Sequence, residues 1–382
     1  MIKLVVNIIL IMQPKKHFSK PFDDGTKIKL EIFKNYLIEW LPVFISSKNN
    51  NYWEHIIIYD FFAGEGKDSK GNYGSPLIIL DVLNKYNDLV VSTNVKIKVI
   101  LNEVEYNTLV QLQNNINEFG YNRDKVEVVL YNKSFNILFN ELFPLMSKKP
   151  KIPRLMILDQ FGIKEITEDI FKKLLALERT DFVFFISSSF VRRFNELPEF
   201  SNYIKIKKKN FDESKPFHCH RVVFDYYKSL ISNDYRLAPF SIKKGINIYG
   251  LIFGSNHTYG LEKFLKVGWN INPHTGDANF NIDGEKIIEG IPSLFEEYNT
   301  IRKIELLNKK LDRSIFEKNE NSLYNLYVKT LEFGCLAKHC NDYLRRLEKE
   351  KKISINGNLK SEKIHTLAKY SDVEILIKNE TI

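Results

Sequence analysis

The chain is poor in the residues that build disulfide or metal scaffolds. It has three cysteines in 382 residues, Cys219, Cys335 and Cys340, and none of them forms a CxxC pair. An odd number of widely spaced cysteines argues against a disulfide framework and favours a reducing compartment, so we expect a cytoplasmic protein. Cys335 and Cys340 flank His339. That stretch has helical spacing, and buried free cysteine is a common small core residue, so we expect no metal site.

Long apolar runs are scarce as well. Residues 1–12, MIKLVVNIILIM, faintly resemble a signal peptide, but they carry Asn7 and lack a small-residue cleavage site. They are also too short to span a bilayer. No other segment is apolar enough to do so, and we expect no membrane partner. We interpret residues 1–20 as a tail or as a misassigned start, with Met12 as the alternative first residue.

The composition is that of an ordinary globular protein with a basic balance. Apolar residues make up 44% and charged residues 27% of the chain, which is long enough to bury a sizeable core. The 56 Lys and Arg exceed the 47 Asp and Glu by nine. This excess is compatible with DNA or RNA as a partner, although Lys- and Asn-rich sequences also follow from AT-rich genomes.

Strand and helix patterns alternate through the first half of the chain. Continuous apolar runs, as expected of strands covered on both faces, occur at 56–61, 95–102, 126–131, 155–159 and 182–186. Amphipathic stretches predict helices at 26–45, 75–86, 106–119, 134–146 and 167–178. The alternation predicts an α/β fold with a doubly wound, Rossmann-like sheet.

Residues 190–245 interrupt this pattern and predict a mainly helical insertion. The alternation resumes with a strand at 247–255 and a helix at 259–266, and a terminal hairpin with a loop around 273–276 is expected next. We therefore assign residues 21–300 to one Rossmann-like domain that contains the insertion.

A change of character from residue 316 predicts a separate C-terminal domain, 316–382. Two helices precede ISINGNLKSEKIHTL, in which Asn356-Gly357 is a strong hairpin dipeptide. Helix, turn, helix and hairpin in this order are typical of a winged helix. A winged helix that binds a duplex uses its second helix and its wing, so candidate nucleic-acid contacts are Arg345, Arg346, Lys349 and Lys360. Docking of a protein on ordinary solvated lysines is the alternative.

The motif YDFFAGEGK, residues 59–67, points to a ligand site at the end of the first predicted strand. Asp60 ends the strand, and Phe62, Gly64 and Gly66 lie in a turn where glycines let a ligand approach the backbone. The third glycine of G-x-G-x-x-G is missing, and Glu65 would repel a diphosphate. A nicotinamide or flavin is thus less suitable than S-adenosylmethionine, which carries an ammonium group, a sulfonium and one carboxylate.

Polar residues at the ends of the next strands extend this candidate site. Glu103 follows the second strand and is placed to accept hydrogen bonds from ribose hydroxyls. Asn132 follows the third strand and could meet the adenine edge. Capping of a neighbouring helix is the alternative for each.

Asp159-Gln160-Phe161-Gly162 ends the fourth strand. Many amino-methyltransferases carry an acid or Asn here, then two prolines and an aromatic residue that stacks on a flipped-out base. Asp159 and Phe161 are therefore candidate catalytic residues, while Gln160 departs from the pattern. Helix capping by Asp159 is the alternative. Arg192 and Arg193 follow the fifth strand and either contact phosphate or are solvated.

An ordered set of motifs in this chain resembles the three-Cys-motif partner proteins. The motifs are GTKIKLEIFKNYLIEWLP, YDFFAGEGK with GSPLIIL, LDQFGIK, and GLIFGSNHTYGLEKFLKVGW with DANFNI. Members typically read Asp-Pro-Phe-Gly where this chain has Gln160. The resemblance implies a class I methyltransferase-like Rossmann domain and a gene-neighbour partner that bears a three-cysteine motif.

Two functions follow as hypotheses. One is an S-adenosylmethionine-dependent methyltransferase acting on nucleic acid together with that partner. The other is a catalytically inactive Rossmann and winged-helix module that senses a nucleotide or binds nucleic acid.

Overall fold

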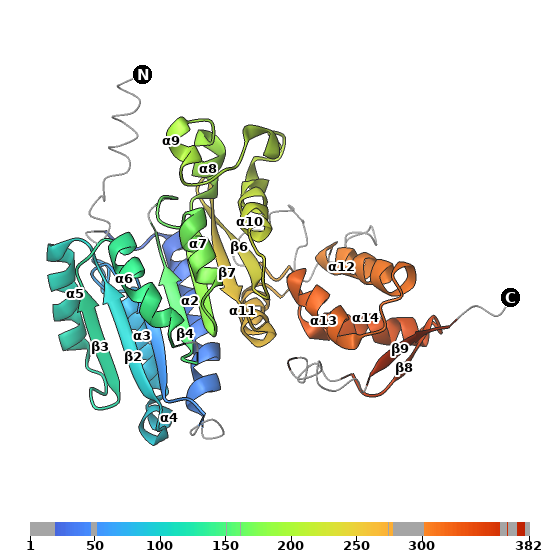
Figure 1. Ribbon diagram of the computed structural model, residues 1–382, viewed down its shortest axis with the longest axis horizontal. Coiled ribbons are helices and arrows are strands. Elements are labelled where there is room, and N and C mark those ends of the chain that lie inside the picture. Colours follow the sequence, from blue (N-terminus) through green and yellow to red (C-terminus); the bar gives the residue numbers. More distant parts are fainter. Residues whose placement is uncertain are drawn as a thin grey trace. The chain divides into compact units, whose positions relative to one another are not determined.

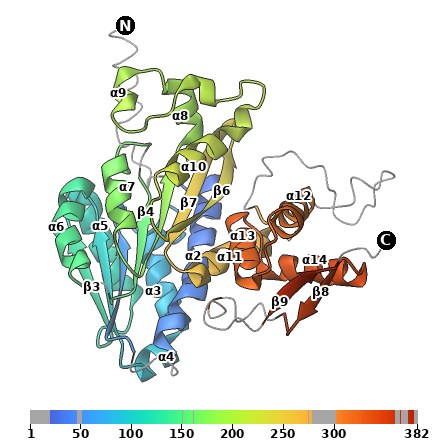
Figure 2. The same cartoon turned by 45° about the vertical axis from the view of Figure 1, so that its right-hand side comes forward.

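The computed structural model describes residues 20–46, 52–149, 151–160, 162–273, 275–277, 302–359, 365 and 373–378 (Figures 1 and 2). They form two compact units. The first runs to Tyr235 and then from Pro239 to Asn256, and the second comprises Arg236–Ala238 and the described residues from His257 onward. The sequence pattern predicts residues 257–300 as part of the first domain, whereas the described residues from His257 onward belong to the second unit.

A seven-stranded sheet of order β3-β2-β1-β4-β5-β7-β6 forms the centre of the first unit (Figure 1). Its strands are β1 (His55–Asp60), β2 (Lys96–Asn102), β3 (Val126–Tyr131), β4 (Arg154–Leu158), β5 (Thr180–Ile186), β6 (Arg236–Lys244) and β7 (Asn247–Ser255). Strands β1 to β5 are parallel, and β7 runs antiparallel to β5. The strand order reverses between β1 and β4, and open α/β sheets bind ligands at such a point. This is the doubly wound, class I methyltransferase-like sheet that the sequence predicts.

Helices cover both faces of this sheet. They are α2 (Asp24–Ile45), α3 (Ser75–Lys85), α4 (Asn87–Ser92), α5 (Tyr106–Phe119), α6 (Phe135–Ser147), α7 (Glu168–Leu175), α8 (Ser188–Phe194), α9 (Pro198–Ser201) and α10 (Cys219–Ser229). Lys29 of α2 lies over Phe185 of β5, whereas Phe171 of α7 contacts the neighbouring Phe184. Because successive side chains of a strand point to opposite faces, α2 and α7 lie on opposite sides of the sheet.

Two element predictions beyond β5 are wrong in part. The insertion is helical only up to α10, and residues 236–244 form strand β6. The strand is hard to recognise because it contains Pro239, which an edge strand tolerates. The next predicted helix, 259–266, is the longer α11 (Thr258–Ile271), so residues 267–271 do not begin a hairpin. Residues 274 and 278–300 lie outside the described residues.

The second unit contains α11, α12 (Arg302–Asp312), a π-helical turn Arg313–Glu317, α13 (Leu323–Glu332), α14 (Ala337–Lys349), β8 (Ile353–Asn356) and β9 (Glu374–Ile377). Strands β8 and β9 are antiparallel, with Asn356 opposite Glu374. The tight hairpin predicted at Asn356-Gly357 is therefore wrong, because the pairing strand comes later in the chain. No helix in the described part of either unit is long and apolar enough to cross a membrane.

Candidate cofactor and acceptor site

The sheet brings the predicted polar residues of the first unit to one edge. Asp60 is the last residue of β1, and Glu103, Asn132 and Asp159 directly follow β2, β3 and β4. These strands are parallel, so their carboxyl ends meet beside the switch point. The charges of Asp159 and Glu103 lie near enough to Asp60 to raise the pKa of its carboxyl.

Asp60 is a buried acid with unsatisfied hydrogen-bonding capacity. The residue is 1% exposed, and the Phe62 N–H donates to Oδ1 at 3.2 Å. Oδ2 is buried and has no hydrogen-bond partner among the described residues. Burial, reinforced by the nearby charges of Asp159 and Glu103, raises the pKa of Asp60 to about 7, although the hydrogen bond from Phe62 opposes this shift. A buried polar atom without a partner carries a desolvation cost that a bound donor or cation would relieve.

The glycine turn after β1 requires glycine at two positions. Gly64 and Gly66 have φ of 61° and 84°, in the left-handed region that side chains disfavour. A Cβ at Gly66 would also lie 3.0 Å from Leu112 Cδ1. The loop that follows is fixed by Asp68, whose Oδ1 accepts the N–H groups of Lys70 and Asn72 at 2.8 and 2.9 Å. Asp68 thus fixes the loop that directly follows the glycine turn.

Glu103 connects this turn to the end of β2. Its Oε2 accepts the Gly64 N–H at 3.0 Å and its Oε1 accepts the Glu105 N–H at 2.9 Å. Burial raises the pKa of Glu103 above its usual value. A carboxylate oxygen has capacity for a second hydrogen bond, so Glu103 can still accept from a diol. Beside it, Val104 and Tyr106 are 56% and 67% exposed and offer an apolar surface that no sequence motif indicates.

Two asparagines hold the loops around Glu103. The amide of Asn102 donates to the carbonyls of Phe61 (3.1 Å) and Lys133 (2.9 Å). The Asn132 amide donates to the Glu103 and Val104 carbonyls at 2.7 and 2.8 Å, so it fixes the β2–α5 loop. Asn102 was not predicted, although a polar residue at the end of an apolar strand was a usable signal.

The acceptor candidate Asp159 is half-buried and forms an ion pair with Lys29 Nζ. The same ammonium lies 4.7 Å from the ring centre of Phe185, and Phe185 stacks on Tyr249 at 5.2 Å. Lys29 and Asp159 are 130 residues apart, and nothing in the sequence links them. Phe161, the other catalytic candidate, lies outside the described residues.

The side chain of Gln160 binds the backbone of the loop that follows β4. Its Oε1 accepts the N–H groups of Glu165 and Ile166 at 3.0 and 3.2 Å, and the residue is 2% exposed. The side chain therefore braces the loop at residues 165 and 166.

The predicted nucleic-acid contacts lie in the second unit. Arg345, Arg346 and Lys349 are exposed on α14. Arg345 lies 4.0 Å from Asp342 and Arg346 lies 3.9 Å from Glu350, so acids of the same segment offset part of their charge. Lys360 lies outside the described residues.

The structure assembles no metal site within its described residues, where no three His, Cys, Asp or Glu side chains converge suitably. Cys219, Cys335 and Cys340 are all buried free thiols.

No family model matches the sequence, and no curated protein matches it either. Among solved structures, Trm1 from Pyrococcus horikoshii with S-adenosyl-L-methionine is similar over 63% of this chain and 59% of its own, with 10% identity and a TM-score of 0.39. The O-methyltransferase TomG from Streptomyces achromogenes in complex with SAM is similar over 64% and 99%, with 10% identity and a TM-score of 0.32. The METTL16 methyltransferase domain is similar over 59% and 83%, with 10% identity and a TM-score of 0.31. This chain thus spans less than two thirds of Trm1, and likenesses this weak transfer neither activity nor substrate.

Proposed function

We propose that the first unit binds S-adenosylmethionine and transfers its methyl group to a nucleic acid. The observation that carries the cofactor assignment is the hydrogen bond between Glu103 and Gly64 of the glycine turn, beside the buried Asp60 oxygen that has no hydrogen-bond partner among the described residues. A cation next to Asp60 would favour its ionised form, and the cofactor carries two positive centres.

The residues present fit this group. The Asp60 carboxylate would hold a positive centre, the Gly64–Gly66 turn would admit the chain of the amino acid, and Glu103 would accept from ribose hydroxyls. Val104 and Tyr106 are exposed next to Glu103 and suit the flat face of adenine. When bound, the cofactor supplies an electrophilic methyl group, and the protein supplies orientation.

Calorimetry tests the cofactor site. We expect micromolar binding of S-adenosylmethionine or its demethylated product, roughly −8 kcal/mol. Glu103→Ala should cost about 1.5–3 kcal/mol, because charge-assisted hydrogen bonds are lost. Glu105→Ala is the matched control: Glu105 is exposed two residues on, and it contributes a backbone N–H that alanine keeps. Binding of NAD, with no heat of binding from S-adenosylmethionine or its demethylated product, would refute the assignment of the cofactor.

Asp159 is proposed to position the methyl acceptor. Its Oδ2 is taken by Lys29, which fixes the carboxylate and leaves Oδ1 to accept a hydrogen bond from an acceptor amine. Asp159→Ala should abolish methyl transfer from labelled cofactor to bulk RNA or DNA while cofactor affinity stays within about twofold. An equal loss of binding and transfer would make Asp159 a cofactor or structural residue.

A binding module without chemistry is the second candidate. It is favoured by the ion pair that occupies one oxygen of Asp159 and by Gln160, which braces a loop instead of stiffening the acceptor segment. Cofactor binding without transfer to RNA, DNA or protein would select this function.

The second unit is proposed to be a winged helix. Helices α13 and α14 precede the antiparallel strands β8 and β9, and Ser322 forms an isolated antiparallel bridge with Glu374 of β9. The resemblance to three-Cys-motif partner proteins adds the proposal that a neighbouring three-cysteine gene product binds the chain. Co-purification of that product, tagged, with this chain tests the interaction.

A further inference from the structure

The segment from α8 to the start of α10 lies at the same edge of the sheet as Asp159. Helix α8 begins two residues after β5 ends, and Figure 1 shows α8 and α9 beyond the ends of the parallel strands. Any acceptor that reaches Asp159 must approach this edge. The chemistry of the segment therefore bears on the class of acceptor.

Residues 188–222 carry a concentrated positive charge. They contain eight Lys and Arg but only four Asp and Glu, an excess of four in a chain whose total excess is nine. The alternation Ile204-Lys205-Ile206-Lys207 explains how the charge is displayed. Ile204 and Ile206 are 2% and 6% exposed, while Lys205 and the lysines from 207 to 209 are exposed.

Acids neutralise this surface only in part. Partly or fully exposed ion pairs join Arg192 to Glu213 (3.0 Å), Lys205 to Glu168 (3.2 Å) and Lys208 to Glu196 (3.2 Å). Exposed pairs are weak and exchange readily for another anion. Since the segment holds half as many acids as cations, a net positive face remains whichever pairs form.

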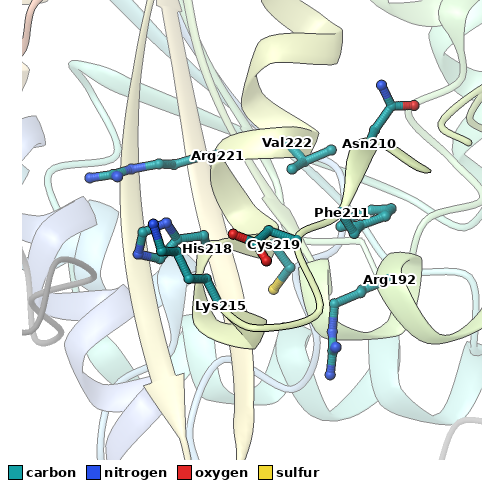
Figure 3. A pocket seen from close by; sticks show the side chains of 9 residues that line it. Arg192, Asn210, Phe211, Lys215, His218, Cys219, Arg221 and Val222 are labelled. Atoms are coloured by element: carbon teal, nitrogen blue, oxygen red, sulfur yellow. The ribbon is translucent and has the colours of Figure 1, made fainter. Parts of the chain in front are cut away.

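A small cavity opens within this segment (Figure 3). Its volume is about 180 Å³, below the roughly 300 Å³ at which sites for drug-sized ligands begin. It suits a single group rather than a whole nucleotide. The lining includes the cations Arg192, Lys215 and Arg221, together with His218 and the acid Asp212.

The two arginines of α8 differ in role. Arg193 donates to the Ser189 carbonyl (3.1 Å) and to Asn247 (2.6 Å), so it holds the helix in place. Arg192 lines the cavity, and its Nε is buried without a hydrogen-bond partner among the described residues. An anionic oxygen in the cavity would satisfy that donor.

We propose that residues 188–222 form a phosphate-binding element that seats single-stranded nucleic acid at the carboxyl edge of the sheet. One backbone phosphate enters the cavity of Arg192, and the lysines from 207 to 209 contact neighbouring phosphates. A base must leave its duplex to reach an acid at this edge, so the substrate is single-stranded or locally opened. This deepens the proposed function and rests on it for the methyl transfer, but the binding is measurable without any reaction.

The test is fluorescence anisotropy with labelled 20-nucleotide RNA and DNA of one sequence, titrated from about 50 to 300 mM salt. Lys207→Gln/Lys208→Gln/Lys209→Gln should weaken binding at least tenfold at low salt. It should also lower the log–log salt slope by about 2, since each contact on a single strand contributes about 0.7. Arg192→Gln should lower the slope by about 0.7.

The matched control removes three charges at the opposite edge, Lys96→Gln/Lys148→Gln/Lys149→Gln. These lysines are exposed at the start of β2 and before β4, and we expect less than a twofold change. The proposal is supported if the protein binds RNA, DNA or both, and if, of the two triple variants, only that of Lys207, Lys208 and Lys209 weakens that binding. The strand that binds shows whether the phosphate belongs to RNA or to DNA. Equal effects of the two triple variants overturn it.

Two further outcomes also overturn the proposal: no binding to either strand at low salt, or loss of binding only on Arg345→Glu/Arg346→Glu. Calorimetry with S-adenosylmethionine on the same proteins separates the two proposals. Cofactor binding without nucleic-acid binding removes this inference alone. Nucleic-acid binding without cofactor binding removes the methyltransferase alone.

Discussion

At the scale of single residues, the pKa of about 7 at Asp60 makes cofactor binding depend on pH. Below pH 7 the free protein holds Asp60 neutral, and a bound cation favours the ionised form. Affinity for S-adenosylmethionine should therefore rise from pH 6 to pH 8, and binding near pH 7 should release part of a proton. Calorimetry in phosphate and in Tris buffer at pH 7 measures the proton count.

Asp60→Asn is the control for this coupling. The amide keeps the size of the side chain but does not titrate near neutral pH, so the buffer dependence should disappear. Wild-type protein that binds with the same heat in both buffers, after correction for dilution, would place Asp60 away from the cationic group.

Single residues were predictable where the signal is local. Asp60, Glu103 and Asp159 each follow an apolar run, and parallel strands bring such ends together. The partners of these residues were not predictable. Lys29 lies on the polar face of a helix like any solvated lysine, and its pairing with Asp159 exists only because α2 crosses that edge. The sequence predicts that Asn132 contacts the adenine edge, but its side-chain amide donates hydrogen bonds to the backbone carbonyls of Glu103 and Val104.

At the scale of elements, the contact between α10 and β7 depends on one glycine and one histidine. His220 is buried and its Nδ1 lies 2.9 Å from Ser188 Oγ. A Cβ at Gly250 would be 1.8 Å from the His220 ring. Gly250→Ala should therefore lower the free energy of unfolding by about 1–3 kcal/mol, measured by urea denaturation.

A double-mutant cycle identifies the cause. His220→Ala removes the ring that the methyl group added by Gly250→Ala would strike, so the double variant should lose less stability than the sum of the single variants. Additive losses would show that Gly250 matters for a reason other than its contact with His220.

The sequence predicts elements well where hydrophobic periodicity sets their boundaries, and poorly where pairing between distant strands sets them. The helix over 106–119 begins and ends as predicted, since its boundaries follow from amphipathic spacing and Gly120. Strand β6 was missed because an edge position relaxes the rule against proline. The hairpin at Asn356-Gly357 was wrong because the turn preference of two residues was weaker than the pairing of Ile355 with Ile375.

At the scale of the whole molecule, the half-buried Asp181 and the buried His220 make opposite contributions to the pH dependence of stability. Burial raises the pKa of Asp181 to about 6 and lowers the pKa of His220 to about 4. Between pH 4 and 6 the folded protein holds a proton on Asp181 that the unfolded chain has lost. The contribution of Asp181 to the free energy of unfolding therefore falls as pH rises. Over the same range His220 is protonated in the unfolded chain but not in the folded protein. The contribution of His220 to the free energy of unfolding therefore rises with pH. The two slopes oppose each other.

Removing one group at a time should expose the other. Relative to wild type, Asp181→Asn should make the free energy of unfolding rise more steeply with pH, and His220→Gln should make it rise less steeply or fall. Each change is at most about 1.4 kcal/mol per pH unit between pH 4.5 and 5.5. Trp269 belongs to the second unit and the other two tryptophans, Trp40 and Trp53, to the first. Urea denaturation in a Trp269→Phe background, followed by fluorescence, therefore reports on the unit that holds both groups. Slope changes of the same sign in both variants would contradict the assigned protonation states.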